Sequence, residues 1–127
     1  MPNLPRTTRA LLVAACLASP LAMAAPETVL VTYLAKPHEE AALAKVLDQH
    51  WQTARKLNLM QASPHVVLRR DDNGKTTFVE VFTWRDASIP DSAPETITAL
   101  WQQMNDLTEK RDGKPNLDFT AMQLLAP

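Results

Sequence analysis

The dipeptide Asn73-Gly74 constrains the fold of this chain more than any other feature, because it separates two runs rich in β-branched and aromatic residues. Residues 65–70 read HVVLRR, and residues 76–85 read TTFVEVFTWR. Asn-Gly is the preferred sequence for a two-residue turn between antiparallel strands, since both residues tolerate a positive φ. The sequence therefore predicts a β-hairpin here.

A strand and a helix are predicted before this hairpin, and a helix and a strand after it. Residues 28–34 (TVLVTYL) predict a strand, and a helix should open at Lys36-Pro37 and end near Asn58. Ser92 and Glu95 have the spacing of a capping box for the second helix. Residues 116–125 predict the last strand.

Each predicted helix has one apolar face, as expected of a helix that covers a sheet. The first face comprises Leu43, Val46, Leu47, His50, Ala54 and Leu57, and the second comprises Ile97, Leu100, Trp101, Met104, Leu107 and Thr108. The order βαββαβ predicts a ferredoxin-like α+β fold with a four-stranded antiparallel sheet. Because crossovers are right-handed, both helices should lie on one face of that sheet.

The first 24 residues predict export. Arg6 and Arg9 precede an apolar stretch at 10–22, and Ala22-Met23-Ala24 has the small-x-small pattern of a signal-peptide cleavage site. The stretch is shorter than the roughly 20 residues of a membrane-spanning helix, so we expect no membrane span. Cleavage after Ala24 would leave residues 25–127 as one periplasmic or secreted domain.

An alternative interpretation of the same segment is a lipoprotein signal. Residues 13–16 (VAAC) are similar to a lipobox, in which Cys16 would be lipidated and become the first residue. Only six apolar residues would then separate Arg9 from Cys16, fewer than the roughly 7 to 15 of a typical signal core.

The mature part has an acidic balance and no thiol. Loss of Arg6 and Arg9 lowers the number of basic residues from 13 to 11 while all 14 acidic residues remain, so the formal net charge becomes −3. Such a charge disfavours nucleic acid as a partner. Because Cys16 also leaves and the three histidines are 12 and 15 residues apart, we expect no metal and no other cofactor.

Alternation along residues 76–85 separates two sets of side chains. Val79, Val81 and Thr83 point to one face, whereas Phe78, Glu80, Phe82 and Trp84 point to the other. Small branched residues suit the face beneath the helices, so we expect the aromatic set on the open face. An aromatic open face would exceed the apolar patch that soluble monomers usually expose, which predicts a homodimer.

The length of the turn decides which residues of the preceding strand share this face. A two-residue turn pairs Arg69 with Phe78 and His65 with Phe82, which would place Arg69 and His65 beside the aromatic set. A three-residue turn would reverse their direction.

The chain resembles the dimeric α+β barrel superfamily, in particular domains similar to antibiotic biosynthesis monooxygenases (ABM-like domains). The resemblance is carried by the opening strand that runs into Lys36-Pro37 and a long helix, and by the sequence FVEVFTW at 78–84 before the second helix. It implies a homodimer with a small organic molecule in the space enclosed by each sheet. Members include cofactor-free oxygenases of aromatic compounds and heme-degrading enzymes.

The sequence departs from two patterns of that superfamily. An acidic residue often stands two places before the strand-three tryptophan, where this chain has Phe82, with Glu80 two places earlier. Heme-degrading members use an Asn in strand one and a His near the second helix, but residues 28–34 contain no Asn and residues 88–109 contain no His. Heme degradation is therefore disfavoured.

Glu80 and His65 are the candidate acid-base residues, because a partly desolvated carboxylate or an imidazole can accept a proton near neutral pH. Each has a structural alternative: for Glu80 it is an ion pair with Arg69 or with a group across the dimer, and for His65 it is a surface position at a strand end. His50 is more simply a hydrogen-bonded core or rim residue. The candidate ligand-binding residues are Tyr33, Phe78, Glu80, Phe82 and Trp84.

Three functional hypotheses remain. The first is an exported homodimer that binds a small apolar or aromatic molecule on the open sheet face. The second is a cofactor-independent monooxygenase with Glu80 or His65 as the base. The third is a purely structural dimer whose aromatic residues fill the interface.

Overall fold

The computed structural model describes residues 25–125, so the predictions of signal cleavage and of lipidation at Cys16 lie outside the described residues. No helix in the described range is long and apolar enough to span a membrane. The elements, in chain order, are β1 (Glu27–Ala35), α1 (Glu40–Lys56), β2 (Met60–Asp72), β3 (Lys75–Trp84), the 3-10 helix η1 (Ile89–Ser92), α2 (Glu95–Asp106), β4 (Thr108–Glu109) and β5 (Asp118–Met122).

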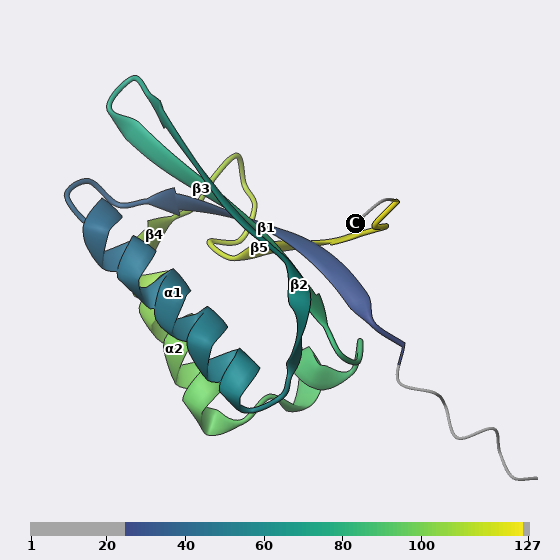
Figure 1. The fold of residues 1–127 in the computed structure, drawn as a ribbon. Coiled ribbons are helices and arrows are strands. Elements are labelled where there is room, and N and C mark those ends of the chain that lie inside the picture. The colour runs from purple at the N-terminus through teal and green to yellow at the C-terminus, as the bar shows by residue number, and fades with distance from the viewer. Residues whose placement is uncertain (1–24, 126–127) are drawn as a thin grey trace, which may run out of the picture.

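The strands form an antiparallel sheet in the order β2-β3-β1-β4, and β5 also pairs with β1. Both α-helices lie on one side of this sheet, and no helix of residues 25–125 lies on the other side (Figure 1). This arrangement confirms the predicted ferredoxin-like βαββαβ fold. The short β4 is an addition that the sequence did not predict.

The β2–β3 hairpin confirms the two-residue turn. Asp72 pairs with Lys75, and Asn73 and Gly74 have φ values of 51° and 75° between them. Positive φ at both central residues is the turn geometry that the Asn-Gly sequence predicts. The predicted pairs Arg69 with Phe78 and His65 with Phe82 are present. β2 begins earlier than predicted, at Met60, and its register shifts between Met60 and His65.

The helices follow their predicted apolar faces but differ at their ends. α1 begins at Glu40, because His38 before it adopts a φ of 69°, outside helical geometry. Leu57 caps α1 and is 43% exposed, whereas the rest of the predicted face is buried. Pro94 is the N-cap of α2 with no side-chain hydrogen bond, so the predicted capping box between Ser92 and Glu95 is not formed.

The prediction that the aromatic set of β3 lies on the open face is wrong. Phe78, Glu80, Phe82 and Trp84 are each at most 3% exposed. The ring of His50 on α1 contacts Phe82 and Trp84 edge-on, with centroids 5.9 and 6.2 Å away. Alternation separates two sets of side chains but does not show which set faces the core. The larger rings face the helices because burying them removes more apolar area from water.

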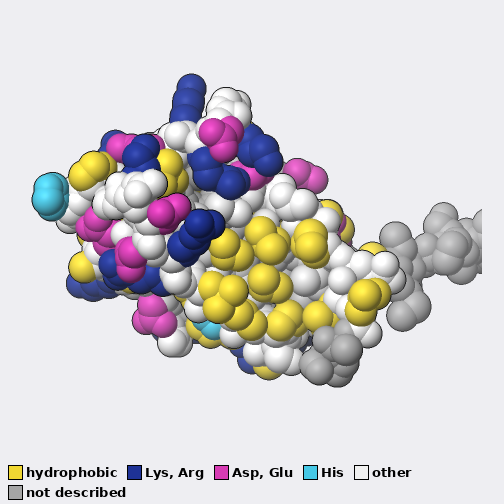
Figure 2. Space-filling model, turned by 90° about the horizontal axis from the view of Figure 1, so that it is seen from above, with side chains coloured by type: hydrophobic (Ala, Val, Ile, Leu, Met, Phe, Trp, Pro, Cys, Tyr) yellow, Lys and Arg dark blue, Asp and Glu magenta, His cyan; other side chains and the backbone are white. Residues whose placement is uncertain are grey.

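The open face is aliphatic instead (Figure 2). Val81 pairs with Val66 on one side and with Leu30 on the other, and antiparallel partners share a face. Apolar side chains gather at the centre of this face. Those on its outer strands, Val66, Leu68 and Met122, belong to the most exposed apolar residues of the described chain. We call this set the aliphatic face; it comprises Leu30, Val66, Leu68, Val79, Val81 and Met122.

Candidate functional site

A chain of polar side chains is buried between the sheet and α1. The hydroxyl of Tyr33 donates a hydrogen bond of 2.9 Å to Oε1 of Glu80, and Nε2 of His65 lies 3.3 Å from Oε2 of the same carboxylate. Glu80 is fully buried, and each of its oxygens has one partner. The structure therefore brings together three of the candidate residues, one from each of β1, β2 and β3.

Tyr33 serves as a permanent donor in this chain. Burial raises the pKa of its phenol well above the ordinary value, and the charge of Glu80 and the hydrogen bond to it act in the same direction. The phenol therefore keeps its proton over the physiological range. Charge-assisted hydrogen bonds of this kind offset the free-energy cost of desolvating the carboxylate of Glu80.

His65 connects this buried chain to the surface. Its imidazole stacks on the indole of Trp51 from α1, with centroids 3.7 Å apart and planes within 2° of parallel. The guanidinium of Arg55 lies 5.9 Å from the centroid of the Trp51 ring, and the side chain of His65 is 23% exposed. The sequence does not predict Trp51 as a neighbour of His65, because only the tertiary fold places α1 over β2 at this point.

His50 is a hydrogen-bonded core residue, as the sequence indicated. Nε1 of Trp101 donates a hydrogen bond of 3.0 Å to Nε2 of His50, which joins α2 to α1. An accepting Nε2 places the proton of neutral His50 on Nδ1. Within residues 25–125, this Nδ1 and Nε1 of Trp84 are buried without a hydrogen-bond partner.

Burial lowers the pKa of His50, an effect that nearby Glu80 opposes and His65 reinforces. The unfolded chain therefore binds a proton at His50 more readily than the folded chain does. Below the unfolded value of about 6.5, the free energy of unfolding should fall by up to about 1.4 kcal/mol per pH unit from this residue. This contribution is fully present above pH 6.5 and declines as the pH falls toward the lowered folded pKa.

Urea unfolding at pH 7.5 and at pH 5.5 checks this prediction when wild type is compared with His50→Gln. The variant should lose less stability between the two pH values than wild type does. An equal loss would show that His50 does not titrate differently in the two states. His38→Gln is the matched control, because His38 is an exposed histidine on the segment before α1.

A hollow of about 280 Å³ lies between one end of the sheet and the segment from η1 to α2. Three aromatic rings line it. The ring centroids of Trp84 and Trp101 are 6.2 Å apart, and those of Trp101 and Phe119 are also 6.2 Å apart. We call it the tryptophan hollow; its other lining residues are Glu27, Val29, Ala87, Pro90 and Asp91. Trp84 is the one predicted ligand residue among them, since Tyr33, Phe78, Glu80 and Phe82 do not line it.

A second hollow, of about 420 Å³, lies at the far end of the sheet beside the β2–β3 turn. Its lining mixes cations and carboxylates, and two of its arginines are already paired: Arg70 with Asp72 and Arg111 with Asp118. Although larger, it is more open and has no aromatic lining. The tryptophan hollow is therefore the better-formed candidate site.

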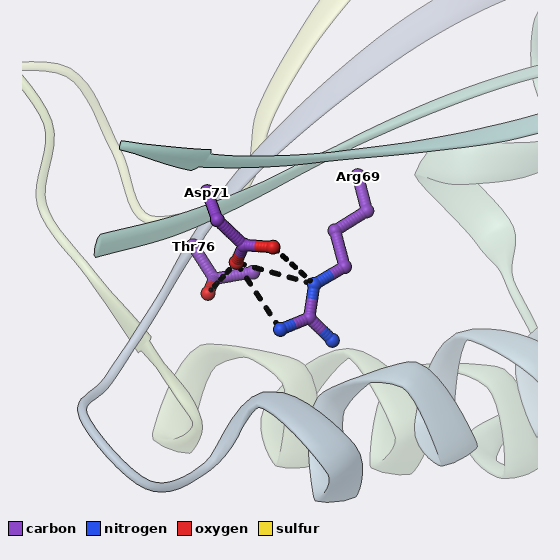
Figure 3. Close-up of polar contacts among 3 residues, drawn as sticks. All are labelled: Arg69, Asp71 and Thr76. Atoms are coloured by element: carbon purple, nitrogen blue, oxygen red, sulfur yellow. Dashed lines mark hydrogen bonds and ion pairs between the residues drawn. The ribbon is translucent and has the colours of Figure 1, made fainter. Parts of the chain in front are cut away.

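Arg69 does not pair with Glu80, which removes one structural alternative for that carboxylate. Nε of Arg69 lies 3.1 Å from Oδ2 of Asp71, and the hydroxyl of Thr76 donates a hydrogen bond of 2.6 Å to Oδ1 (Figure 3). Hydrogen bonds from Arg69 and then Thr76 lower the pKa of Asp71. The guanidinium also lies 5.8 Å from the centroid of Phe78. Arg69 thus belongs to the exposed hairpin rather than to the buried polar chain.

Comparison with known proteins identifies the fold but no sequence family. No family model and no curated protein matches the sequence. Among solved structures, SnoaB, a cofactor-independent oxygenase from Streptomyces nogalater, superposes with a TM-score of 0.60 at 12% identity, covering 80% of this chain and 95% of its own. Rv0793 from Mycobacterium tuberculosis gives a TM-score of 0.58 at 16% identity, covering 81% and 98%.

An antibiotic biosynthesis monooxygenase also superposes, with a TM-score of 0.51 at 17% identity, covering 79% of this chain and 99% of its own. These matches extend over nearly the whole length of each neighbour. At such identities they concern the fold and not the chemistry. The chain thus has the same α+β fold as these solved structures, among them ABM-like monooxygenases.

Proposed function

We propose that this protein is a homodimer that binds a small molecule with an apolar or aromatic body in the tryptophan hollow of each subunit. The observation that carries the proposal is the lining itself: three aromatic rings around about 280 Å³. Ligand sites are typically concave and lined by aromatic side chains with a few polar groups. From the sequence we expected the ligand on the open face of the sheet, but the aromatic residues lie on the face that the helices cover.

The aliphatic face supports the homodimer. Leu68 is 58% exposed and Met122 is 48% exposed, and strand pairing places both on the aliphatic face. Water-exposed apolar patches of this kind mark protein interfaces. The resemblance to the dimeric α+β barrel superfamily supports pairing of the two open faces.

Native mass spectrometry of the purified protein tests dimer and ligand together. We expect the mass of a dimer, and a bound molecule or saturable binding of an added probe such as 1-naphthol. Binding of 1-naphthol should quench the fluorescence of Trp84 and Trp101 and should weaken at least tenfold in Trp101→Leu. A dimer that binds neither a retained molecule nor the probe would favour the purely structural alternative.

Export is part of the same proposal. It is supported by the pattern of Arg6, Arg9 and Ala22-Met23-Ala24. Intact mass of the protein from a periplasmic fraction should correspond to a chain that begins at Ala25. A diacylglyceryl mass on Cys16 would instead establish the lipoprotein alternative.

Cofactor-independent oxygenation is the second candidate function, favoured by the chain Tyr33–Glu80–His65. Glu80 could accept a proton relayed through His65, whose ring is the partly exposed end of the chain. Because Glu80 does not line the tryptophan hollow, an oxygenase substrate would have to be deprotonated at His65. The likeness to SnoaB, a cofactor-independent oxygenase, supports the same candidate.

Oxygen consumption with a panel of electron-rich phenols tests this second candidate. General acid-base catalysis typically contributes 10²- to 10⁴-fold, so turnover should fall by at least about 100-fold in Glu80→Gln. Asp48→Asn, which removes an exposed carboxylate of α1, should leave turnover unchanged. Equal turnover in Glu80→Gln and wild type would remove Glu80 from the mechanism.

A further inference from the structure

The tryptophan hollow has a one-sided charge. Its eight lining residues include two carboxylates, Glu27 from the start of β1 and Asp91 from η1, and no lysine, arginine or histidine. Within residues 25–125, neither carboxylate takes part in an ion pair. An occupant with a positive charge would therefore gain attraction from both, whereas an anion would be repelled.

The aromatic rings of the hollow favour the same sign of charge. Trp84 and Trp101 stand nearly perpendicular to one another, at 85°, and Phe119 meets Trp101 at 66°. Of these three rings, Trp101 and Phe119 keep exposed surface, whereas Trp84 has none. The face of an indole is the strongest cation–π partner among the side chains, and several such faces around one space bind quaternary ammonium groups.

Trp84 lines the hollow but offers no accessible surface to a bound molecule. Its ring is fully buried, and its Nε1 is buried without a hydrogen-bond partner in the described chain. A bound molecule therefore contacts Trp101 and Phe119, which both keep exposed surface. At about 280 Å³, the space is just below the usual range of roughly 300–1,000 Å³ for ligand sites.

We propose that the tryptophan hollow binds a small organic cation, namely a methylated ammonium compound. The ammonium group lies against Trp101 and Phe119, with Glu27 and Asp91 nearby. This inference rests on the proposed ligand-binding role of the hollow and names the class of ligand.

Calorimetric titration of the purified protein with three probes tests the inference. Choline carries the cation and a hydroxyl, 3,3-dimethyl-1-butanol is its neutral isostere, and 1-naphthol reports on apolar binding alone. We expect choline to bind at least tenfold more tightly than its isostere and to weaken as sodium chloride is added, since exposed charges are screened by salt. The isostere should show little dependence on salt.

Carboxylate variants locate the effect. The double variant Glu27→Gln with Asp91→Asn should reduce the preference for choline over the isostere at least threefold and leave the affinity for the isostere unchanged; the remaining preference comes from the aromatic rings. The charge-matched control, Asp48→Asn with Asp112→Asn, removes two exposed carboxylates that do not line the hollow. It should retain the full preference for choline, which also excludes a general effect of net charge.

The outcomes separate this inference from the function on which it rests. Equal binding of choline and its isostere, or binding of 1-naphthol alone, would overturn the cation and leave a ligand-binding hollow in place. Absence of binding for all three probes would overturn both. A preference for choline that is undiminished in the Glu27→Gln/Asp91→Asn variant would overturn the site assigned here.

Discussion

Replacing Trp84 by alanine is expected to lower the free energy of unfolding by about 3–5 kcal/mol, the usual cost of truncating a fully buried tryptophan. Trp84 has no exposed surface, and its ring meets Phe82, His50 and Trp101 edge-on at centroid distances of 5.0, 6.2 and 6.2 Å. Truncation removes these contacts at once. For a domain of about 100 residues, the melting temperature should fall by at least about 12 °C.

Urea unfolding at one fixed protein concentration measures this loss, because the stability of a dimer depends on concentration. Trp51→Ala is the matched control: Trp51 is only half-buried and stacks on His65 at the edge of the core. It should cost clearly less than Trp84→Ala. Equal losses from the two variants would mean that the packing between β3 and the helices does not dominate the stability of this fold.

A lysine on the aliphatic face is expected to convert the proposed dimer into a monomer. Val66→Lys places a charge where two apolar faces would meet, and burying an unpaired charge costs several kcal/mol. The dissociation constant of the dimer should rise at least about 100-fold, equivalent to about 2.7 kcal/mol. Light scattering at micromolar concentration should then report a monomer, while the circular dichroism spectrum stays that of the folded chain.

The adjacent valine provides a closely matched control. Val66 and Val67 are 42% and 44% exposed on the same strand, but Val66 pairs with Val81 on the aliphatic face and Val67 pairs with Glu80 on the opposite one. Val67→Lys should therefore leave the dimer intact. Dissociation by both variants, or by neither, would contradict an interface formed by the aliphatic face.

Several features followed from the sequence because their causes are local. Asn73-Gly74 determined the turn and with it the register of β2 against β3, since few dipeptides reach positive φ at both positions. The apolar period of α1 identified its buried face from Leu43 to Ala54. The order of the elements then determined the ferredoxin-like topology, because crossover handedness leaves few alternatives.

Other features depended on contacts between segments that are distant in the sequence. Alternation along β3 separated Val81 from Phe82 but could not show which of them faces the helices, because that depends on the volume between sheet and helices. The same holds for the start of α2, where Pro94 takes the N-cap position in place of the predicted Ser92 cap.

The two candidate sites, the buried polar chain around Glu80 and the tryptophan hollow, show the same difference between local and long-range causes. The sequence by itself determined that β3 carries Glu80 among aromatic residues. Only the tertiary structure joined it to Tyr33 and His65, which are 47 and 15 positions away, and brought Glu27, Asp91 and Phe119 around Trp84 and Trp101. The physical reason is that turns and amphipathic periods depend on neighbours along the chain, whereas a binding site depends on side chains that meet only when the layers pack.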